Sequence, residues 1–181
     1  MDDNEELPTG KLYRYDERGL KVMDDDYVIT NGPAVSPDGK ILYHNDTLKK
    51  VIYAFDLDAG GHLSNKRVFA QLDAAGTQGE HGEGYMDGPV VDSAGNVWNA
   101  LFFGWCINCY APDGRLLRKV RLPVSNVTKI AFGGHDLKTV YVATRRQRLV
   151  GRRYQATTAG RRPVRFETDI PGQPQNEIVH V

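Results

Sequence analysis

The stretch SPDGKILY at residues 36–43 decides the fold class, because two similar phrases follow it along the chain. These are DSAGNVW at 92–98 and GGHDLKTVY at 133–141. In each copy a tight turn leads into a short strand that ends in an aromatic residue, which is typical of a β-hairpin. The copies recur about 40–56 residues apart, a spacing that fits four strands with their loops, or one blade of a β-propeller.

The rest of the chain has the same β-rich character, and no apolar stripe of helical period is sustained over three turns. Residues 10–23 predict the outer hairpin of one blade, 32–70 a second blade, 87–121 a third, and 128 onward a fourth. We therefore expect an all-β protein in which residues 1–181 form one partial propeller domain of about three and a half blades. The clearest strands are expected at 11–15, 41–44, 51–57, 97–101, 107–110, 116–122 and 139–143. Such a partial propeller exposes a blade edge, through which we expect self-association.

The composition is ordinary for a soluble globular protein, with 40% hydrophobic and 25% charged residues in a chain of 181. No apolar run of about 18 residues exists, so the sequence predicts no membrane-spanning helix and no membrane partner. The first residues, MDDNEE, are acidic, whereas a secretory signal begins with basic residues and continues with apolar ones. We therefore expect a cytoplasmic protein.

The net charge of zero conceals a split along the chain. Residues 1–90 carry 17 acidic and 9 basic side chains, whereas residues 91–181 carry 6 and 14. Eight of those 14 are arginines between Arg145 and Arg165, a stretch without Asp or Glu. Such a cluster is one mark of a nucleic-acid-binding protein, which makes nucleic-acid binding an alternative function.

Cys106 and Cys109 form a CxxC pair, a pattern found in metal knuckles and redox sites. The flanking residues predict a strand, in which these positions face opposite sides with Cα atoms roughly 10 Å apart. That separation is beyond the reach of a disulfide. We expect two buried, inert thiols.

Many further phrases resemble one family in the same order along the chain. They include GKLYRYD at 10–16, NGPAVSPDGKILYHNDT at 31–47, IYAFDLDAGGHLSN at 52–65, EGYMDGPVVDSAGNVWNALFFGW at 83–105 and YAPDGRLLRKVRLPVSNVTKIAFGG at 110–134. DLKTVYVATRR follows at 136–146. From Lys11 to Arg145 the chain thus resembles the regucalcin/gluconolactonase family of six-bladed propellers, which includes sugar lactonases. The resemblance implies a hydrolase of sugar lactones and one bound divalent metal ion.

In this family the metal is held by a Glu, an Asn and an Asp from different blades. The resemblance places the Asn at Asn31 and the Asp at Asp87, where Met86-Asp87-Gly88 replaces the usual PDG. Carboxylate and amide oxygens suit Ca²⁺ or Mg²⁺, and Zn²⁺ also accepts carboxylates. Asp87 is then a metal ligand and the candidate general base on a metal-bound water. The family's Glu lies well before the NG phrase and has no counterpart here, so we expect impaired activity; no substrate-binding residue is identified.

Each of these residues also has a plainer interpretation. Taken alone, Asn31-Gly32 and Asp87-Gly88 are typical of tight turns. Asp38, Asp56, Asp58 and Asp113 are expected in hairpin turns with structural roles. Asp46 follows a strand and is a weaker candidate to face the central channel of the propeller. The histidines, at 44, 62, 81, 135 and 180, show no ligand spacing and are expected at the surface or in packing. The aromatic residues Trp98, Phe102, Phe103 and Trp105 favour blade core over a sugar platform.

The resemblance stops after Arg146 and resumes at FETDIPGQP, residues 166–174. Residues 147–164 can be back-translated into codons that, read from the second base, encode KGLSDADIKRQPLAGGL, which resembles the family's bacterial members. We interpret this segment as the product of two compensating frameshifts, so the arginine cluster carries no nucleic-acid function. The two functions left open are a metal-dependent lactonase and a non-catalytic propeller fragment that binds Ca²⁺ or another ligand.

Overall fold

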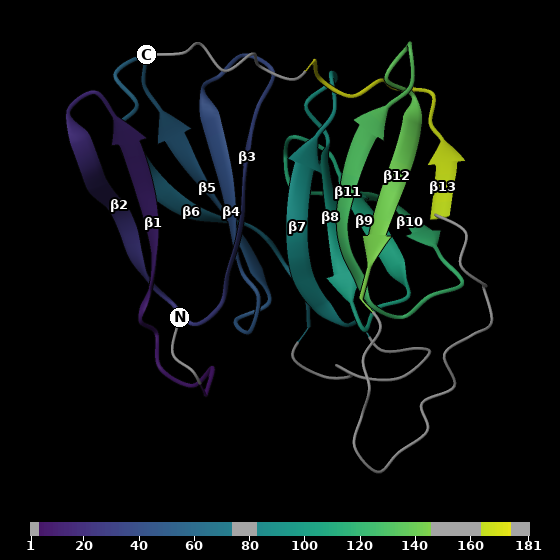
Figure 1. The fold of residues 1–181 in the computed structure, drawn as a ribbon, viewed down its shortest axis with the longest axis horizontal. Helices are drawn as coiled ribbons and strands as arrows, with labels where there is room; N and C mark the ends of the chain where they lie inside the picture. The colour runs from purple at the N-terminus through teal and green to yellow at the C-terminus, as the bar shows by residue number, and fades with distance from the viewer. Residues whose placement is uncertain (1–3, 74–82, 146–163, 175–181) are drawn as a thin grey trace.

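The computed structural model describes residues 4–73, 83–145 and 164–174, which form four antiparallel sheets and no helix. Consecutive strands pair with one another, as the repeated hairpin phrases predict. Figure 1 shows the sheets as successive upright blades along the molecule. Of the arginine cluster between Arg145 and Arg165, residues 146–163 lie outside the described part of the chain, and Val164 and Arg165 begin β13. Within the described part no helix is long and apolar enough to cross a membrane.

The first sheet is a hairpin of two strands, β1 (Gly10–Asp16) and β2 (Gly19–Tyr27). The second sheet has the strand order β3-β4-β5-β6, with β3 at Thr30–Val35, β4 at Ile41–Asp46, β5 at Val51–Leu57 and β6 at Leu63–Gln71. The expected hairpin at 10–23 and the expected blade at 32–70 are both confirmed.

The third sheet has the order β7-β8-β9-β10, with β7 at Tyr85–Val91, β8 at Val97–Phe102, β9 at Cys106–Tyr110 and β10 at Leu116–Arg121. The fourth sheet pairs β11 (Val127–Gly133) with β12 (Thr139–Thr144), and β12 with β13 (Val164–Glu167). The expected blade at 87–121 and the start of a blade at 128 are confirmed. The fold is a partial propeller whose described sheets do not close into a ring.

The third sheet is buried on both faces, because β8 and β9 send alternate side chains to two separate cores. Val97, Leu101 and Cys106 face the second sheet, where they pack with Tyr43, Ile52 and Met86. Trp98, Ile107 and Cys109 face the fourth sheet, where they pack with Ile130 and Val140. The two cysteines are free and buried in different cores, which confirms the expectation of two unpaired thiols.

The innermost strands β3, β7 and β11 lie side by side, with β7 between the other two (Figure 1). Gln173, in the segment after β13, ties the far ends of two of them together. Its side-chain amide donates to the carbonyl oxygens of Val35 on β3 at 3.0 Å and of Val91 on β7 at 3.2 Å. The neighbouring Gly172 forms a β-bridge with Asp92. The relative position of β3 and β7 is thereby fixed at one end of these two strands.

The β1–β2 hairpin exposes several large apolar side chains, namely Tyr13, Tyr15, Leu20 and Val22. An exposed apolar strand pair is a surface on which other chains tend to add. Self-association through an open propeller edge stays a prediction.

Candidate functional site

Asn31 and Asp87 both lie at irregularities of innermost strands. Asn31 pairs with Asn45 of β4, after which the register shifts until Ala34. Asp87 lies within the corresponding shift of β7, between Met86 and Pro89. Such bulges turn a side chain away from its regular direction and are common beside active sites. Both residues therefore lie inside strands, and the tight-turn interpretation of these two phrases is wrong.

Gly32 gives the bulge of β3 a conformation that other residues rarely adopt, with φ at +120°. A Cβ atom added at this position would lie 3.2 Å from Nδ1 of His44 and 3.4 Å from Cγ of Pro89. Glycine is needed here for both its backbone conformation and its small size. The close approach also shows that β3 packs directly on β7 beside Asn31.

The backbone of Asp87 is held from two sides. The side-chain amide nitrogens of Asn45 on β4 and Asn99 on β8 both donate to the Asp87 carbonyl oxygen, Asn99 at 2.7 Å. Both asparagines are completely buried between the second and third sheets. A bulge frees a carbonyl from the strand ladder, and a buried carbonyl needs a donor. The two amides meet that need and fix Asp87 in relation to Asn31, the strand partner of Asn45.

The Asp87 side chain is half-buried and keeps acceptor capacity. The backbone N–H of Gly88 donates to Oδ1 at 2.8 Å, and no donor to Oδ2 is found among the described residues. Burial raises the pKa of this carboxyl above its ordinary value, while the Gly88 hydrogen bond and the charge of Lys129 oppose that rise. A raised pKa makes the carboxylate a stronger base.

Asn31 is oriented by its own hydrogen bond. Its Nδ2 donates to Oγ1 of Thr47 at 2.7 Å, and the described part of the chain offers no donor to its Oδ1. One carboxylate oxygen and one amide oxygen on adjacent strands fit a hard divalent cation. Residues 4–73, 83–145 and 164–174 contain no group of three or more His, Cys, Asp and Glu suited to a metal. A metal ion bound here would therefore need further ligands in addition to Asn31 and Asp87.

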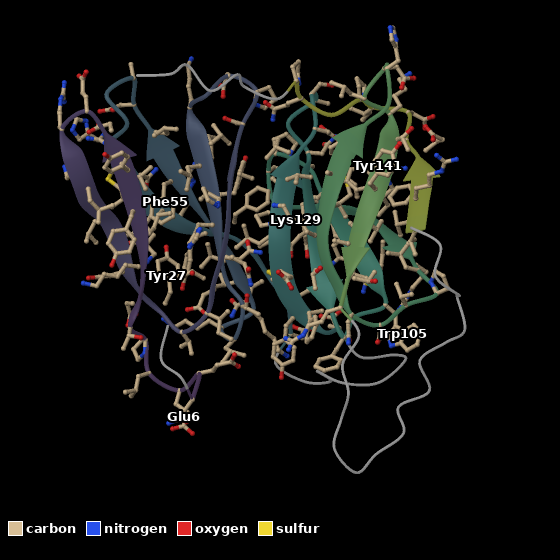
Figure 2. The ribbon with its side chains drawn as sticks, viewed as in Figure 1. Glu6, Tyr27, Phe55, Trp105, Lys129 and Tyr141 are labelled. Atoms are coloured by element: carbon tan, nitrogen blue, oxygen red, sulfur yellow. The ribbon has the colours of Figure 1, made fainter. Side chains whose placement is uncertain are left out.

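Lys129, on β11, is a second charged group beside this site, and sequence reasoning did not single it out. Its Nζ donates to the carbonyl oxygen of Pro89 at 2.7 Å. Burial lowers the pKa of Lys129, and the charge of Asp87 opposes that change. Figure 2 labels Lys129 and shows it reaching toward β7 from the neighbouring blade. Asn45 and Asn99 were also missed, although a buried amide within an apolar run such as VWNALF is a usable signal.

The other aspartates considered above accept hydrogen bonds from backbone or side-chain donors. Asp46, the weaker candidate, is completely buried and accepts the backbone N–H groups of Val28 and Lys49. Asp38, Asp58 and Asp113 accept backbone N–H groups in turns. Asp56 was expected in a hairpin turn, which is wrong: it lies in β5 and binds Arg67 at 2.8 Å. The strand continues to Leu57, so the turn begins only after Asp56.

The histidines do not form a ligand set in the described part of the chain. His44 is buried and packs edge-to-face on Tyr27, with ring centroids 4.8 Å apart. Burial lowers its pKa to about 4, so the ring is neutral at physiological pH. His62 is exposed beside Asp58, His135 is exposed, and His81 and His180 lie outside the described residues. The expectation of surface and packing roles is confirmed for the described three.

Among the aromatic candidates, Trp98 is completely buried and donates Nε1–H to Asp92 at 2.9 Å. This confirms its role in the blade core. Phe102, Phe103 and Trp105 are only half-buried, and the rings of Phe102 and Phe103 contact each other with centroids 4.5 Å apart. Phe102 ends β8, and Phe103 and Trp105 lie in the loop that leads to β9, so the expected core role is not borne out for these three.

Comparison with known proteins identifies the family. Residues 1–146 match the family described as the SMP-30/Gluconolactonase/LRE-like region. The chain is 37% identical to a 6-deoxy-6-sulfogluconolactonase of Pseudomonas putida, over 76% of this chain and 46% of that protein. It is 32% identical to a pentonolactonase of Haloferax volcanii, over 75% of this chain and 45% of the relative.

A solved structure supports the same class. The crystal structure of a calcium-binding protein, regucalcin, from Agrobacterium tumefaciens superposes with a TM-score of 0.83 and 25% identity, over 96% of this chain and 57% of that one. The protein is thus a propeller of the class that includes lactonases and regucalcins. The chain belongs to the SMP-30/gluconolactonase family, and it spans about half the length of the curated relatives it matches.

Proposed function

We propose that this protein hydrolyses a sugar lactone to the aldonic acid, with one divalent metal ion bound at Asn31 and Asp87. The observation that carries the proposal is the pair of oxygen donors at matching bulges of β3 and β7. Relatives named as lactonases support the substrate class. Ca²⁺, Zn²⁺ and Mg²⁺ are all compatible with a carboxylate and an amide oxygen.

Asp87 has two roles in this proposal. One carboxylate oxygen keeps its hydrogen bond from Gly88, and the other binds the metal or accepts a proton from the attacking water. A divalent metal held by Asn31 and Asp87 would polarise the lactone carbonyl. Asp87 would accept a proton from a water molecule as the water oxygen bonds to the carbonyl carbon. The ring C–O bond would then break, and the ring oxygen would take that proton back from Asp87 to become the hydroxyl of the open acid.

The neighbouring residues position these groups. Asn45 and Asn99 fix the backbone of Asp87, and Thr47 fixes the amide of Asn31.

Hydrolysis of aldono-1,4- and 1,5-lactones, followed with a pH indicator at varied Ca²⁺, Mg²⁺ and Zn²⁺, tests the proposal. The chain is assayed alone and joined to any coding sequence that precedes Met1. We expect metal-dependent turnover that Asp87→Asn reduces by about a thousandfold, the size typical of losing a general base with its ligand role. Asp113→Asn, in an exposed turn, is the matched control and should retain full activity. Full activity in Asp87→Asn would contradict the proposal.

A non-catalytic protein that binds Ca²⁺ is the second candidate, favoured by the calcium-binding regucalcin among the structural neighbours. It predicts Ca²⁺ binding that Asp87→Asn removes, without turnover of any aldonolactone. The same assay series therefore separates the two functions.

The frameshift interpretation of residues 147–164 is tested on the coding DNA. We expect one frame change near codon 147 and a compensating one near codon 164. A coding sequence whose second reading frame bears no relation to KGLSDADIKRQPLAGGL would contradict it. With the arginines accidental, we propose no nucleic-acid partner.

A further inference from the structure

Lys129 crosses from one blade to the next at the level of Asp87. It follows the register shift of β11, which lies between Val127 and Lys129. A Cβ atom added at Gly88 would lie 2.4 Å from Cδ of Lys129, so the lysine stem rests directly on the backbone of β7. The absence of a side chain at Gly88 is what lets the stem pass. The ammonium group then donates to the Pro89 carbonyl oxygen at 2.7 Å.

The Lys129 ammonium group is therefore held by the carbonyl of Pro89, which lies two residues after the candidate ligand Asp87 on β7. Among the described residues no ion pair within 4.0 Å joins Lys129 to Asp87, although the two charges influence each other. The carboxylate is left with its Gly88 hydrogen bond and a second oxygen without a described donor. The site thus holds a fixed cation close to a carboxylate that the cation does not neutralise by direct contact.

Two cations beside one carboxylate repel each other, and inside a partly buried site the repulsion is only weakly screened. We propose that Lys129 is a positioning residue that sets the affinity and charge selectivity of the metal site at Asn31 and Asp87, by repelling the bound cation. The proposal rests on the metal-binding function proposed above. It predicts a site that binds divalent ions weakly and reversibly and discriminates against ions of higher charge.

The direct test measures Ca²⁺ binding by calorimetry and Tb³⁺ binding by sensitised luminescence, using the full chain. Lys129→Met keeps the apolar stem against Gly88 and removes the charge. We expect it to raise Ca²⁺ affinity by about tenfold, and Tb³⁺ affinity by about thirtyfold, because the repulsion grows with the charge of the ion. Lys138→Met, near the far end of the same sheet, is the matched control and should leave both affinities unchanged.

The outcomes separate this proposal from the function on which it rests. Equal or weaker Ca²⁺ binding in Lys129→Met, with binding lost in Asp87→Asn, overturns the role of Lys129 and leaves the metal site intact. Binding that survives unchanged in Asp87→Asn overturns the metal site and this proposal with it. An equal gain for Ca²⁺ and Tb³⁺ also counts against the proposal, since the mechanism is electrostatic. Circular dichroism of each variant confirms that the fold is retained.

Discussion

Asn31 and Asp87 occupy corresponding places in two neighbouring blades, each at the register shift of an innermost strand. Asn45 connects them, because it is the strand partner of Asn31 and donates its side-chain amide to the Asp87 carbonyl. Two candidate ligands from separate blades are thus held in one arrangement by a buried amide. The position of each candidate ligand depends on packing between blades as well as on its own blade.

Loss of one buried amide should weaken the site as well as the fold. Asn99→Ala removes a donor to the Asp87 carbonyl, and we expect the free energy of unfolding to fall by about 1–3 kcal/mol. Metal affinity should fall too, because the bulge that carries Asp87 loosens. Asn108→Ala is the matched control: Asn108 is equally buried and lies opposite Asn99, but donates to the Tyr110 hydroxyl. Urea unfolding and Ca²⁺ calorimetry should show both variants destabilised and only Asn99→Ala impaired in binding.

The conformation of Gly32 predicts that Gly32→Ala lowers the free energy of unfolding more than Gly39→Ala does. Gly32→Ala forces a side chain into φ +120° and against His44, and we expect a cost of about 2–3 kcal/mol. Gly39→Ala also has positive φ, but nothing lies within 4 Å of the added Cβ, and we expect about 1 kcal/mol. Denaturant unfolding compares the two variants. Equal losses would show that contact with His44 and Pro89 adds nothing.

The ionised side chain of Asp87 should lower the free energy of unfolding at neutral pH. Its pKa is raised in the folded state by burial, so the protonated form is favoured there. The fold is then more stable, as far as this group is concerned, below the ordinary carboxyl pKa of 3.8, and loses that stability as pH rises through the raised pKa. Asp87→Asn should therefore raise the melting temperature at pH 7 in metal-free buffer, and have no such effect near pH 3.

Asp56→Asn should change the melting temperature in the opposite direction to Asp87→Asn. Hydrogen bonds from Asn65 and Arg67 lower the pKa of Asp56, so its contribution is present above pH 3.8 and is lost as pH falls through the lowered pKa. We expect this variant to melt slightly lower at pH 7. A shift of the same sign in both variants would contradict the assigned environments.

His44 should make the fold sensitive to mild acid. Burial lowers its pKa from 6.5 to about 4, so the unfolded chain takes up this proton before the folded one does. The neutral His44 ring makes its full contribution to the free energy of unfolding above pH 6.5. This contribution falls by up to about 3 kcal/mol as the pH drops toward 4. Urea unfolding at pH 7, 5.5 and 4.5 measures this slope. His44→Leu should flatten it, whereas His62→Leu, at an exposed position, should not.

The sequence predicts the blades well because their signals are local. Strands such as Val51–Leu57 and Cys106–Tyr110 are mostly apolar runs between turn residues, interrupted only by Asp56 and Asn108, as expected for largely buried strands. Asp56 was assigned to the turn because a polar residue near the end of β5 resembles the Asp and Gly residues of the turn that follows. Phe102, Phe103 and Trp105 were misjudged because the aromatic run crosses from a buried strand into a half-exposed loop.

The site was only partly accessible from sequence. Asn31 and Asp87 came from resemblance to a family, since each phrase alone reads as a turn. Asn45 and Lys129 each contact a neighbouring blade, 42 and 40 residues away in the sequence. Asn99 contacts Asp87 on the adjacent strand of its own blade. The repeat pattern of the sequence does not indicate any of these contacts. Lys129 in particular depends on the empty space above Gly88, which only the packed structure reveals.

The central claim is that Asn31 and Asp87 bind the same metal ion, and a double-mutant cycle tests it most directly. Ca²⁺ affinity is measured by calorimetry for the unaltered chain, Asn31→Ala, Asp87→Asn and the double variant. We predict that each single change weakens binding at least tenfold, and that the double variant binds no more weakly than Asp87→Asn, because the two ligands act on one ion. Unchanged affinity in either single variant, or losses that simply add, would contradict the account.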